Sequence, residues 1–377
     1  MKVLQIGKYF FPEKGGIETV TRDISFGLHA NGISADVLCF ERLRANDEQF
    51  PFKIYRAASD IEIFNQSLSA EYVRKIASLK NDYDVALLHL PNPIAMLAVR
   101  YLWDKPLVLL WHSDIVTYPR LRSILRSTEK AVVEKSQVVI TPTPAHAQGS
   151  YLYEQIRSKA EVAPFPFDSE RLKKFALEGM VPSPVAEFLQ GRKLILSVGR
   201  LVPYKGYDVL IEAASKVDAD AAICIIGTGP LDNHLRSKIK ILGLESKIIL
   251  AGYADDRQLA ALYQRAFAVT MPSVTRAEMY GMSQVEAMSF GKPVVSTSLS
   301  MSGVSWVNRD QISGLIVPPN DPCALADALN KLIRDPDLYR RLSSGAENLF
   351  DRSHSLKAAA ERYAEILHDA VTFRVPA

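Results

Sequence analysis

The sequence predicts an α/β fold with two domains, each built around a doubly wound parallel β-sheet. Short apolar runs rich in β-branched residues recur along the 377 residues and alternate with segments of helical period. The runs are continuously apolar rather than alternating, a pattern typical of parallel strands that helices cover on both faces. A stretch rich in proline and glycine separates two sets of runs, and each half is long enough for one domain.

The strands are expected at these apolar runs. In the first half they are Val3–Gly7, Asp36–Phe40, Val85–Leu90, Leu107–Trp111 and Val138–Thr141. In the second half they are Leu194–Gly199, Ala222–Gly227, Ile248–Leu250, Ala268–Met271 and Pro293–Ser296. Helices are expected to follow near the C-terminus, at Asp321–Asp335, Asp337–Phe350 and Ser355–Val371.

The proline- and glycine-rich stretch Glu178–Pro184 is interpreted as an interdomain linker. The expected domains are residues 1–183 and 184–354, with a C-terminal helix within 355–377 that could cross back to the first domain. Ligands of such sheets bind beyond the carboxyl ends of the strands. Two domains that face each other would therefore leave a binding cleft between those ends.

The composition limits the classes of function. The chain has 45 Lys and Arg against 42 Asp and Glu, a net charge of +3, so no nucleic-acid partner is expected. Cys39, Cys224 and Cys323 lie far apart beside apolar runs and are expected to be buried free thiols in a reducing compartment. No CxxC or HExxH motif occurs, and no zinc site is predicted.

The chain begins without the pattern of a signal peptide, and its apolar runs are far shorter than the about 20 residues of a membrane span. A cytoplasmic protein is expected, with at most peripheral contact with the inner face of the plasma membrane. A basic amphipathic helix at Tyr118–Val132, with Leu121, Ile124, Leu125 and Val132 near one face, could provide that contact. An ordinary half-buried helix explains the same pattern.

Two strand ends of the first half carry candidate functional residues. Gly15 and Gly16 open the helix after the first strand, where backbone N–H groups could approach a phosphate or sugar. A plain tight turn is the alternative. His112 follows another strand, and the polar Ser113-Asp114 beside it favours a functional histidine over a buried core histidine. His89 also ends a strand but is interpreted as structural.

Two loops of the second half follow a strand and contain glycine, and the first of them also carries basic residues. Arg200 supplies a planar donor fork and Lys205 a point charge, a combination suited to a diphosphate, although a solvated basic loop would look the same. The next loop, Gly227–Pro230, could hold a nucleotide against its backbone. It is not a dinucleotide fingerprint, because Asp232 stands where the third glycine would fall.

The most specific motif is Pro272–Val295. Glu278 lies in the loop after a strand, Gly281 opens a helix, and Glu286 lies on that helix. Each carboxylate can bridge vicinal hydroxyls, one pair on a sugar and one on a ribose. The helix N-terminus at Met282-Ser283 can meet a phosphate between them. The alternative is that Glu286 is only a solvated helix residue.

On these motifs the chain resembles, over nearly its whole length, the retaining glycosyltransferases of family 4. This family has the GT-B fold of two Rossmann-like domains and includes bacterial O-antigen and lipopolysaccharide mannosyltransferases. The resemblance implies that the first domain binds the acceptor and the second binds a nucleotide sugar. The catalytic residues that it implies are His112, Glu278, Arg200 and Lys205. The donor-binding residues that it implies are Gly15, Gly16, Arg200, Lys205, Gly227, Tyr253, Glu278, Tyr280, Gly281, Met282, Ser283 and Glu286.

The sequence departs from the family pattern at two places. Tyr280 stands where phenylalanine is usual, and Phe165-Pro166 replaces a glycine that often precedes the aspartate at Asp168. The second departure concerns the shape of the acceptor pocket rather than the reaction.

The resemblance also implies a mechanism. The sugar keeps its anomeric configuration while the leaving phosphate takes the acceptor proton, so the protein's main task is electrostatic stabilisation. A double displacement would need Glu278 as nucleophile. No metal cofactor is expected, because two cations and a helix N-terminus face the diphosphate. The Asp-x-Asp motifs at 82–84 and 218–220 precede strands, and the one at 335–337 joins two helices.

On the resemblance to O-antigen mannosyltransferases the favoured donor is GDP-mannose, and a UDP-linked sugar is the alternative. No residue in the sequence reads the base directly, and Tyr253 and Ala254 are its expected neighbours. The implied acceptor is a saccharide hydroxyl, with an undecaprenyl-diphosphate-linked saccharide as one candidate. A sugar-nucleotide 2-epimerase, a nicotinamide-dependent oxidoreductase and a non-catalytic binding protein are rival interpretations. The incomplete dinucleotide-binding glycine motif argues against an oxidoreductase. The combination of the motifs above argues against a non-catalytic binding protein.

Overall fold

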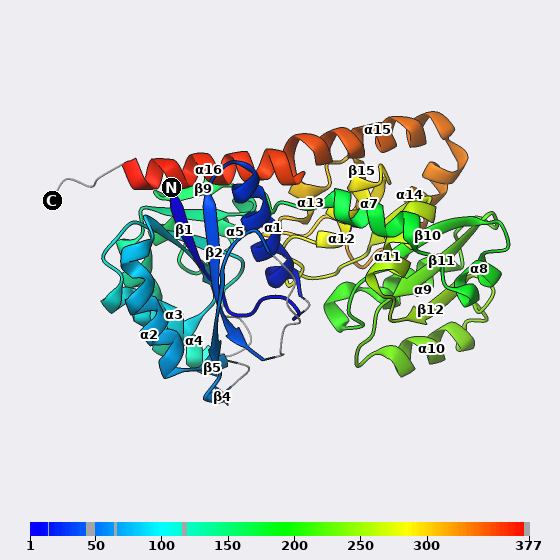
Figure 1. The fold of residues 1–377 in the computed structure, drawn as a ribbon. Helices are drawn as coiled ribbons and strands as arrows, with labels where there is room; N and C mark the ends of the chain where they lie inside the picture. The colour runs from blue at the N-terminus through cyan, green and yellow to red at the C-terminus, as the bar shows by residue number, and fades with distance from the viewer. Residues whose placement is uncertain (14, 43–49, 64–65, 115–118, 373–377) are drawn as a thin grey trace. The chain divides into compact units, whose positions relative to one another are not determined.

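The chain forms two compact units, each an α/β unit with one parallel main sheet (Figure 1). The computed structural model describes residues 1–13, 15–42, 50–63, 66–114 and 119–372. The first unit contains Met1–Phe167 and the C-terminal segment from Leu356, and the second contains Asp168–Ser355. The predicted fold class is confirmed.

The first unit has a seven-stranded parallel sheet in the order β3-β2-β1-β6-β7-β8-β9. Its strands are β1 (Lys2–Ile6), β2 (Ser34–Glu41), β3 (Ile54–Ala58), β6 (Val85–Leu90), β7 (Leu107–Trp111), β8 (Val138–Thr141) and β9 (Ala160–Val162). A separate antiparallel hairpin consists of β4 (Ile61–Ile63) and β5 (Gln66–Leu68). The helices are α1 (Gly16–Ala30), α2 (Ala70–Leu79), α3 (Pro93–Leu102), α4 (Pro119–Lys135), α5 (Pro144–Gln148), α6 (Tyr153–Ile156) and α16 (Leu356–Thr372), with a 3₁₀ turn η1 (Lys80–Asp82).

Burial and capping explain these elements. Every residue of β6 and β7 is buried, as expected of parallel strands covered on both faces. Asn92 caps α3 by accepting a hydrogen bond from the Ala95 N–H at 3.3 Å, and Pro93 pre-sets the first helical turn. The C-terminal helix α16 packs on α1, where a Cβ on Gly27 would lie 2.4 Å from the Cβ of Ala360 (Figure 1). The C-terminal helix therefore does return to the first unit.

The second unit has a six-stranded parallel sheet in the order β12-β11-β10-β13-β14-β15. Its strands are β10 (Lys193–Val198), β11 (Ala221–Ile226), β12 (Ile248–Gly252), β13 (Ala268–Met271), β14 (Val294–Thr297) and β15 (Gly314–Val317). Its helices are α7 (Ser169–Glu178), α8 (Ser183–Leu189), α9 (Tyr207–Ala214), α10 (Asp232–Ile241), α11 (Asp256–Arg265), α12 (Met282–Ser289), α13 (Val304–Val307), α14 (Pro322–Arg334) and α15 (Pro336–Ser353), with a 3₁₀ turn η2 (Pro203–Lys205).

Aspartates begin several helices of this unit. Asp255 and Gln258 form a reciprocal capping box at α11, and Asp321 and Asp335 cap α14 and α15. The core between the sheet and α9, α10 and α14 is aliphatic except for Tyr207, and β11 is buried along its whole length.

Strand order locates the binding edge of each sheet. The order of connection reverses between β1 and β6 in the first unit and between β10 and β13 in the second. In open parallel sheets ligands bind beyond the carboxyl ends of the strands at such a reversal. The loops that leave these four strands are therefore the first places to look for function.

Every strand expected from the sequence is present, with ends within two residues of the expectation. Three strands of the main sheets, β3, β9 and β15, were not expected. All three are sheet edges, and β9 and β15 are only three and four residues long, so neither presents a long apolar run.

The boundary between the units lies earlier than residue 183. The chain passes from the first unit to the second after Phe167, because α7 packs against α11 of the second unit. The stretch Glu178–Pro184, interpreted as a linker, lies inside the second unit between α7 and α8. There a Cβ on Gly179 would lie 2.2 Å from the carbonyl oxygen of Arg257.

Two expectations about burial need correction. Cys39 and Cys224 are buried free thiols as predicted, but Cys323 is exposed at the start of α14, where Lys216 Nζ lies 2.7 Å from its Sγ. On α4, Leu125 and Val132 are buried whereas Ile124 is 74% exposed.

The residues of α4 do not share the single apolar face that was predicted, because consecutive helix positions are about 100° apart and only one of Ile124 and Leu125 can face the sheet. The side chain of Leu121 lies outside the described residues. Among those that are described, no helix combines the length and apolarity that a membrane crossing requires.

Candidate active site

The clearest constellation of the second unit lies at its strand-order reversal. Lys205, from the loop after β10, places its Nζ 2.6 Å from Oε2 of Glu278, from the loop after β13. Both side chains are mostly buried, with 13% and 9% exposed. The Ser273 hydroxyl also donates a hydrogen bond to Glu278 Oε2 at 3.1 Å. A desolvated cation and carboxylate are thus held together where a ligand of this sheet would bind.

Backbone contacts fix the two loops against each other. The Val274 N–H donates to the Tyr204 carbonyl at 2.8 Å. Gly206 has a φ of +69°, and a Cβ there would lie 2.0 Å from the carbonyl oxygen of Pro272. Glycine is therefore required beside Lys205 both by the left-handed conformation and by the close approach of the second loop.

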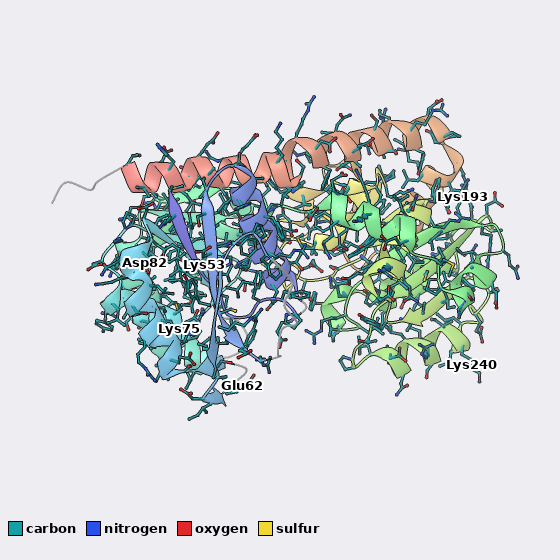
Figure 2. The ribbon with its side chains drawn as sticks, viewed as in Figure 1. Lys53, Glu62, Lys75, Asp82, Lys193 and Lys240 are labelled. Carbon is teal, nitrogen blue, oxygen red and sulfur yellow. The ribbon has the colours of Figure 1, made fainter. Side chains whose placement is uncertain are left out.

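Arg200 is the other cation of the loop after β10. It is exposed, and no group within the described part of the chain forms an ion pair or side-chain hydrogen bond with it. Lys193, labelled in Figure 2, begins β10. Since β10 ends at Val198, Arg200 lies just beyond the opposite end of the same strand. The guanidinium is therefore available to an anionic ligand at the edge that strand order selects.

The glycines of the loop after β11 serve the packing of the protein itself. A Cβ on Gly227 would lie 1.9 Å from the carbonyl oxygen of Gly199, and one on Gly229 would lie 2.5 Å from that of Leu201. The Leu201 N–H donates to the Thr228 carbonyl at 3.0 Å. Gly227 thus holds the loop that carries Arg200, which explains the motif without a nucleotide contact.

The helix α12 begins without a capping side chain. Its N-cap, Gly281, has a φ of +75°, and a Cβ there would lie 2.5 Å from Sδ of Met271. No acidic residue lies in its first turn, so the N–H groups of Met282 and Ser283 face no carboxylate of their own helix. Such an end favours an anion. The Ser283 side chain itself is buried against Met271.

Glu286 lies on α12, partly buried, and accepts a hydrogen bond from the Tyr263 hydroxyl at 2.5 Å. Burial raises the pKa of Glu286, and the hydrogen bond from Tyr263 and the charges of Lys205 and Arg171 oppose that rise. One carboxylate oxygen is occupied by Tyr263, which leaves Oε1 as the oxygen without a hydrogen bond within the described residues.

The two tyrosines predicted to bind the donor differ in exposure. Tyr280 is buried, and its hydroxyl lies 2.9 Å from Nδ1 of the buried His354. This bond accounts for tyrosine where phenylalanine is usual, and it directs the side chain into the unit. Tyr253 is 67% exposed just after β12 and is free to contact a ligand.

In the first unit, His112 is buried at the end of β7 next to the order reversal of the sheet. Its Nε2 lies 3.1 Å from Nδ1 of His89, and the Nε2 of His89 lies 2.9 Å from Oε1 of Gln5. Burial lowers the pKa of His89 to about 3 and lowers that of His112 well below 6.5. Both rings are neutral at physiological pH. His89, interpreted as structural, is thus the direct partner of His112.

The polar residues around His112 have separate roles. Asp114 accepts hydrogen bonds from Trp111 Nε1 at 3.1 Å, from the Ser150 hydroxyl at 2.7 Å and from the Tyr151 N–H at 3.2 Å. Its carboxylate therefore ties β7 to the loop before α6. Phe165, in the segment that departs from the family pattern, stacks on His112 with ring centroids 5.1 Å apart.

The paired glycines at the start of α1 are not equivalent. A Cβ on Gly15 would meet Oε2 of Glu18, whereas a Cβ on Gly16 would meet nothing within 4 Å. Burial raises the pKa of Glu18. The carboxylate of Glu18 thus occupies the space beside Gly15, and the open approach to the helix N-terminus is at Gly16.

The Asp-x-Asp segments have structural roles. Asp82–Asp84 precedes β6, where Asp84 accepts from the Lys2 N–H at 2.7 Å, and Asp82 lies at the surface (Figure 2). Asp218–Asp220 precedes β11 and pairs with Arg334, and Asp335–Asp337 caps α15. Across the described ranges, no three His, Cys, Asp or Glu side chains are grouped as metal ligands.

Comparisons with known proteins agree with this picture. Residues 14–171 match the model of Glycosyltransferase Family 4, and residues 184–349 match that of Glycosyl transferases group 1. The O-antigen chain mannosyltransferase C of Escherichia coli is 27% identical over 97% of this chain and 99% of its own length. The D-rhamnosyltransferase WbpZ of Pseudomonas aeruginosa is 28% identical over 92% of this chain and 90% of its own.

Solved structures show the same fold. The Anabaena HepE protein in complex with UDP covers 98% of this chain and all of its own, with a TM-score of 0.78 and 21% identity. Sucrose-phosphate synthase from Thermosynechococcus elongatus covers 98% of each chain, with a TM-score of 0.74 and 18% identity. The two family models together span most of the chain, which therefore belongs to the glycosyltransferases that join a family 4 domain to a group 1 domain in the GT-B fold.

Proposed function

We propose that this glycosyltransferase moves mannose from GDP-mannose to a saccharide hydroxyl in O-antigen or related polysaccharide synthesis, with retention of configuration. The observation that carries the proposal is the buried Lys205–Glu278 pair at the strand-order reversal of the second unit, together with Arg200 from the same loop as Lys205, which forms no ion pair with any described residue. This arrangement offers two cations to a diphosphate and a carboxylate to sugar hydroxyls. The similarity to an O-antigen mannosyltransferase and a rhamnosyltransferase supports a polysaccharide product.

In this proposal the second unit stabilises charge on the leaving group. Arg200 and Lys205 bind the diphosphate, and the uncapped N-terminus of α12 adds its N–H groups. Glu278 accepts hydrogen bonds from sugar hydroxyls, and Glu286 accepts them from ribose hydroxyls through Oε1. Charge that develops on the diphosphate during bond cleavage is thus met by groups already in place.

The surroundings of Glu278 favour reaction on one face of the sugar, with the leaving phosphate accepting the proton of the acceptor hydroxyl. A double displacement needs a carboxylate free to attack the anomeric carbon. Glu278 Oε2 is already bound by the Lys205 ammonium at 2.6 Å and by the Ser273 hydroxyl. These contacts lower its nucleophilicity and suit a binding role.

We further propose that no metal ion takes part, because Arg200 and Lys205 supply the positive charge that a divalent cation would otherwise bring. The test is transfer measured after dialysis against EDTA. Undiminished turnover supports the proposal, and recovery that depends on added Mg²⁺ or Mn²⁺ contradicts it.

A UDP-linked sugar is the second candidate donor. HepE, which shares the fold, has been crystallised with UDP and with UDP-glucose. The experiment is to supply GDP-mannose or UDP-glucose with lipid-linked saccharides as acceptors and to determine the anomeric configuration of the product by NMR. An α-mannoside formed only from GDP-mannose supports the proposal. A β-linked product contradicts retention, and transfer from UDP-glucose alone contradicts the assigned donor.

We propose that the acceptor is presented at the inner face of the plasma membrane, for instance on undecaprenyl diphosphate, and that the protein binds there peripherally. The exposed Ile124 and Arg126 on α4 support this, because an apolar and a basic side chain together suit an anionic surface. Flotation with anionic vesicles tests it. Recovery that Ile124→Asp removes supports the proposal, and no recovery of the wild type contradicts it.

A further inference from the structure

A buried chain of polar side chains links three strands at the order reversal of the first unit. Gln5 lies on β1, His89 on the neighbouring β6, and His112 directly after β7. The contacts are 2.9 Å between Gln5 Oε1 and His89 Nε2, and 3.1 Å between His89 Nδ1 and His112 Nε2. All three residues are buried, and none has more than 7% of its surface exposed.

The orientation of the Gln5 amide is fixed by its other contacts. Its Nε2 donates to the Thr21 carbonyl at 3.1 Å and to the Ser25 hydroxyl oxygen at 2.5 Å. The Ser25 hydroxyl donates its own proton to the Ala35 carbonyl at 3.0 Å, so its oxygen can only accept from Gln5. The amide oxygen must therefore point at His89.

The proton positions of both histidines follow from this orientation. An amide oxygen can only accept, so His89 carries its proton on Nε2 and donates it to Gln5. A neutral ring then has a lone pair on Nδ1. The Thr21 hydroxyl, 3.3 Å from this nitrogen, gives its proton to the Ile17 carbonyl at 2.8 Å. His89 Nδ1 therefore accepts from the Nε2–H of His112.

Two neighbouring rings also fix the orientation of the His112 ring. His89 lies nearly parallel to it, with centroids 5.3 Å apart and planes 25° apart, and Phe165 stacks on it with centroids 5.1 Å apart and planes 28° apart. Its Nδ1 has no hydrogen-bond partner in the described part of the chain. A neutral imidazole with Nε2–H has a lone pair on Nδ1, which can accept a hydrogen bond but cannot donate one.

We propose that Gln5 and His89 are positioning residues that hold His112 as its Nε2–H tautomer and present Nδ1 as an acceptor for a hydroxyl group of the sugar. The tautomer stands on the contacts above, whereas the sugar as its partner rests on the proposed function. His112 then orients a hydroxyl without supplying a proton to the reaction. The backbone carbonyls of Thr21 and Ala35 can only accept hydrogen bonds, and they thereby set the direction of the hydrogen bonds from Gln5 to His112.

The first test is the tautomer itself, which needs no substrate. The full chain labelled with ¹⁵N-histidine is studied by long-range ¹H–¹⁵N NMR, and His112→Gln identifies the signals of residue 112. A protonated Nε2 with a bare Nδ1 is expected in the wild type, and a mixture of tautomers in Gln5→Met, which keeps the side-chain volume but removes the acceptor. A wild type with Nδ1–H, or with both nitrogens protonated, overturns the proposal.

The second test uses two replacements of His89. Asparagine can place its oxygen near the position of Nδ1 and still accept from His112, whereas phenylalanine keeps the stacked ring and accepts nothing. Turnover of GDP-mannose is expected to fall about tenfold or more in His89→Phe and to be largely kept in His89→Asn. Equal losses in the two variants would reduce His89 to a packing residue and overturn its positioning role.

The two tests separate the inference from the function on which it rests. If the wild-type protein shows the expected tautomer but turns over no nucleotide sugar, the proposed function fails and the assignment of the tautomer stands. If it turns over GDP-mannose with His112 in the other tautomer, the function stands and the inference fails.

Discussion

Lys205 Nζ and Glu278 Oε2 lie 2.6 Å apart although they belong to loops separated by more than seventy residues of sequence. Each loop leaves the carboxyl end of one of two adjacent strands, β10 and β13, and backbone contacts between the loops hold the pair in place. A largely desolvated ion pair stabilises a fold little compared with apolar packing, but each charge is costly when its partner is removed. Its position at the binding edge of the sheet is the basis for the proposal that a ligand interacts with both groups.

Removing one partner should therefore affect both stability and activity. Lys205→Met is expected to lower the free energy of unfolding of the second unit by about 3 kcal/mol, because Glu278 is left unpaired. Transfer should fall about 100-fold or more, because the diphosphate loses a cation. Urea unfolding and turnover measure the two effects. The double variant Lys205→Met, Glu278→Gln should regain stability but no activity, and regained activity would contradict the assignment.

The matched control is the exposed pair Arg340–Asp337 on α15. Arg340→Met should change the unfolding free energy by less than about 1 kcal/mol and leave turnover unchanged, since exposed ion pairs contribute little.

Arg200 should matter for the donor and not for the fold. Arg200→Gln is expected to leave the melting temperature unchanged, because the side chain is exposed and has no partner within the described residues. Affinity for the nucleotide sugar should fall about tenfold or more, as expected for the loss of a charge-assisted hydrogen bond. Calorimetric titration compares it with Arg341→Gln, an exposed arginine on α15. Equal affinities in the two variants would remove Arg200 from the donor site.

Two glycine variants separate packing from ligand approach. Gly227→Ala brings a Cβ to 1.9 Å from the Gly199 carbonyl oxygen, so the loops must move apart and the melting temperature should fall. Gly16→Ala meets nothing within 4 Å and should leave the melting temperature unchanged or raise it slightly. A loss of transfer in Gly16→Ala with a normal melting temperature would place a ligand at this helix N-terminus. Full activity would leave Gly16 as part of a turn.

Stability should fall as the pH drops below about 6.5, in part because of His89. The unfolded chain protonates this histidine near pH 6.5, whereas the folded chain does so only near pH 3. Between these values the unfolded state binds one more proton, so each unit by which the pH falls lowers the free energy of unfolding by about 1.4 kcal/mol. His89→Asn should flatten the fall in melting temperature between pH 7 and pH 5, and the exposed His29→Asn should not. An unchanged slope in His89→Asn would contradict a neutral, buried His89.

The fold was largely predictable because parallel strands buried on both faces leave continuous apolar runs, as in Val85–Leu90 and Ala221–Ile226. The edge strand Ala160–Val162 lacks that signal, since it has only three residues and none of them is fully buried. The unit boundary was placed too late because a proline- and glycine-rich segment also suits the turn between α7 and α8 inside one unit. The packing of α7 on α11 places α7 in the second unit, and such a contact leaves no local pattern in the sequence.

The positions of the candidate site residues were predictable where a residue follows a strand and not where its role depends on a partner. Arg200, Lys205, Glu278 and His112 were named from their positions after strands. The partners Gln5, Ser273 and Tyr263 were not, and His89 was interpreted as structural, because the importance of these residues comes from side-chain contacts that the sequence does not display. The spacing of Gln5, on the first strand, gave no sign that its amide meets a histidine eighty-four residues later.

The central claim is that the second unit binds a guanosine diphosphate sugar through its own cations. The most direct measurement is thermal unfolding of the purified protein with GDP, UDP, ADP or NAD⁺, each with and without EDTA. A ligand that binds only the folded state, supplied at a concentration about 100 times its dissociation constant, stabilises that state by about 2.7 kcal/mol. We predict that GDP raises the melting temperature, that EDTA leaves the shift intact and that Arg200→Gln reduces it. A shift with NAD⁺ alone, or a GDP shift that EDTA abolishes, would contradict the account.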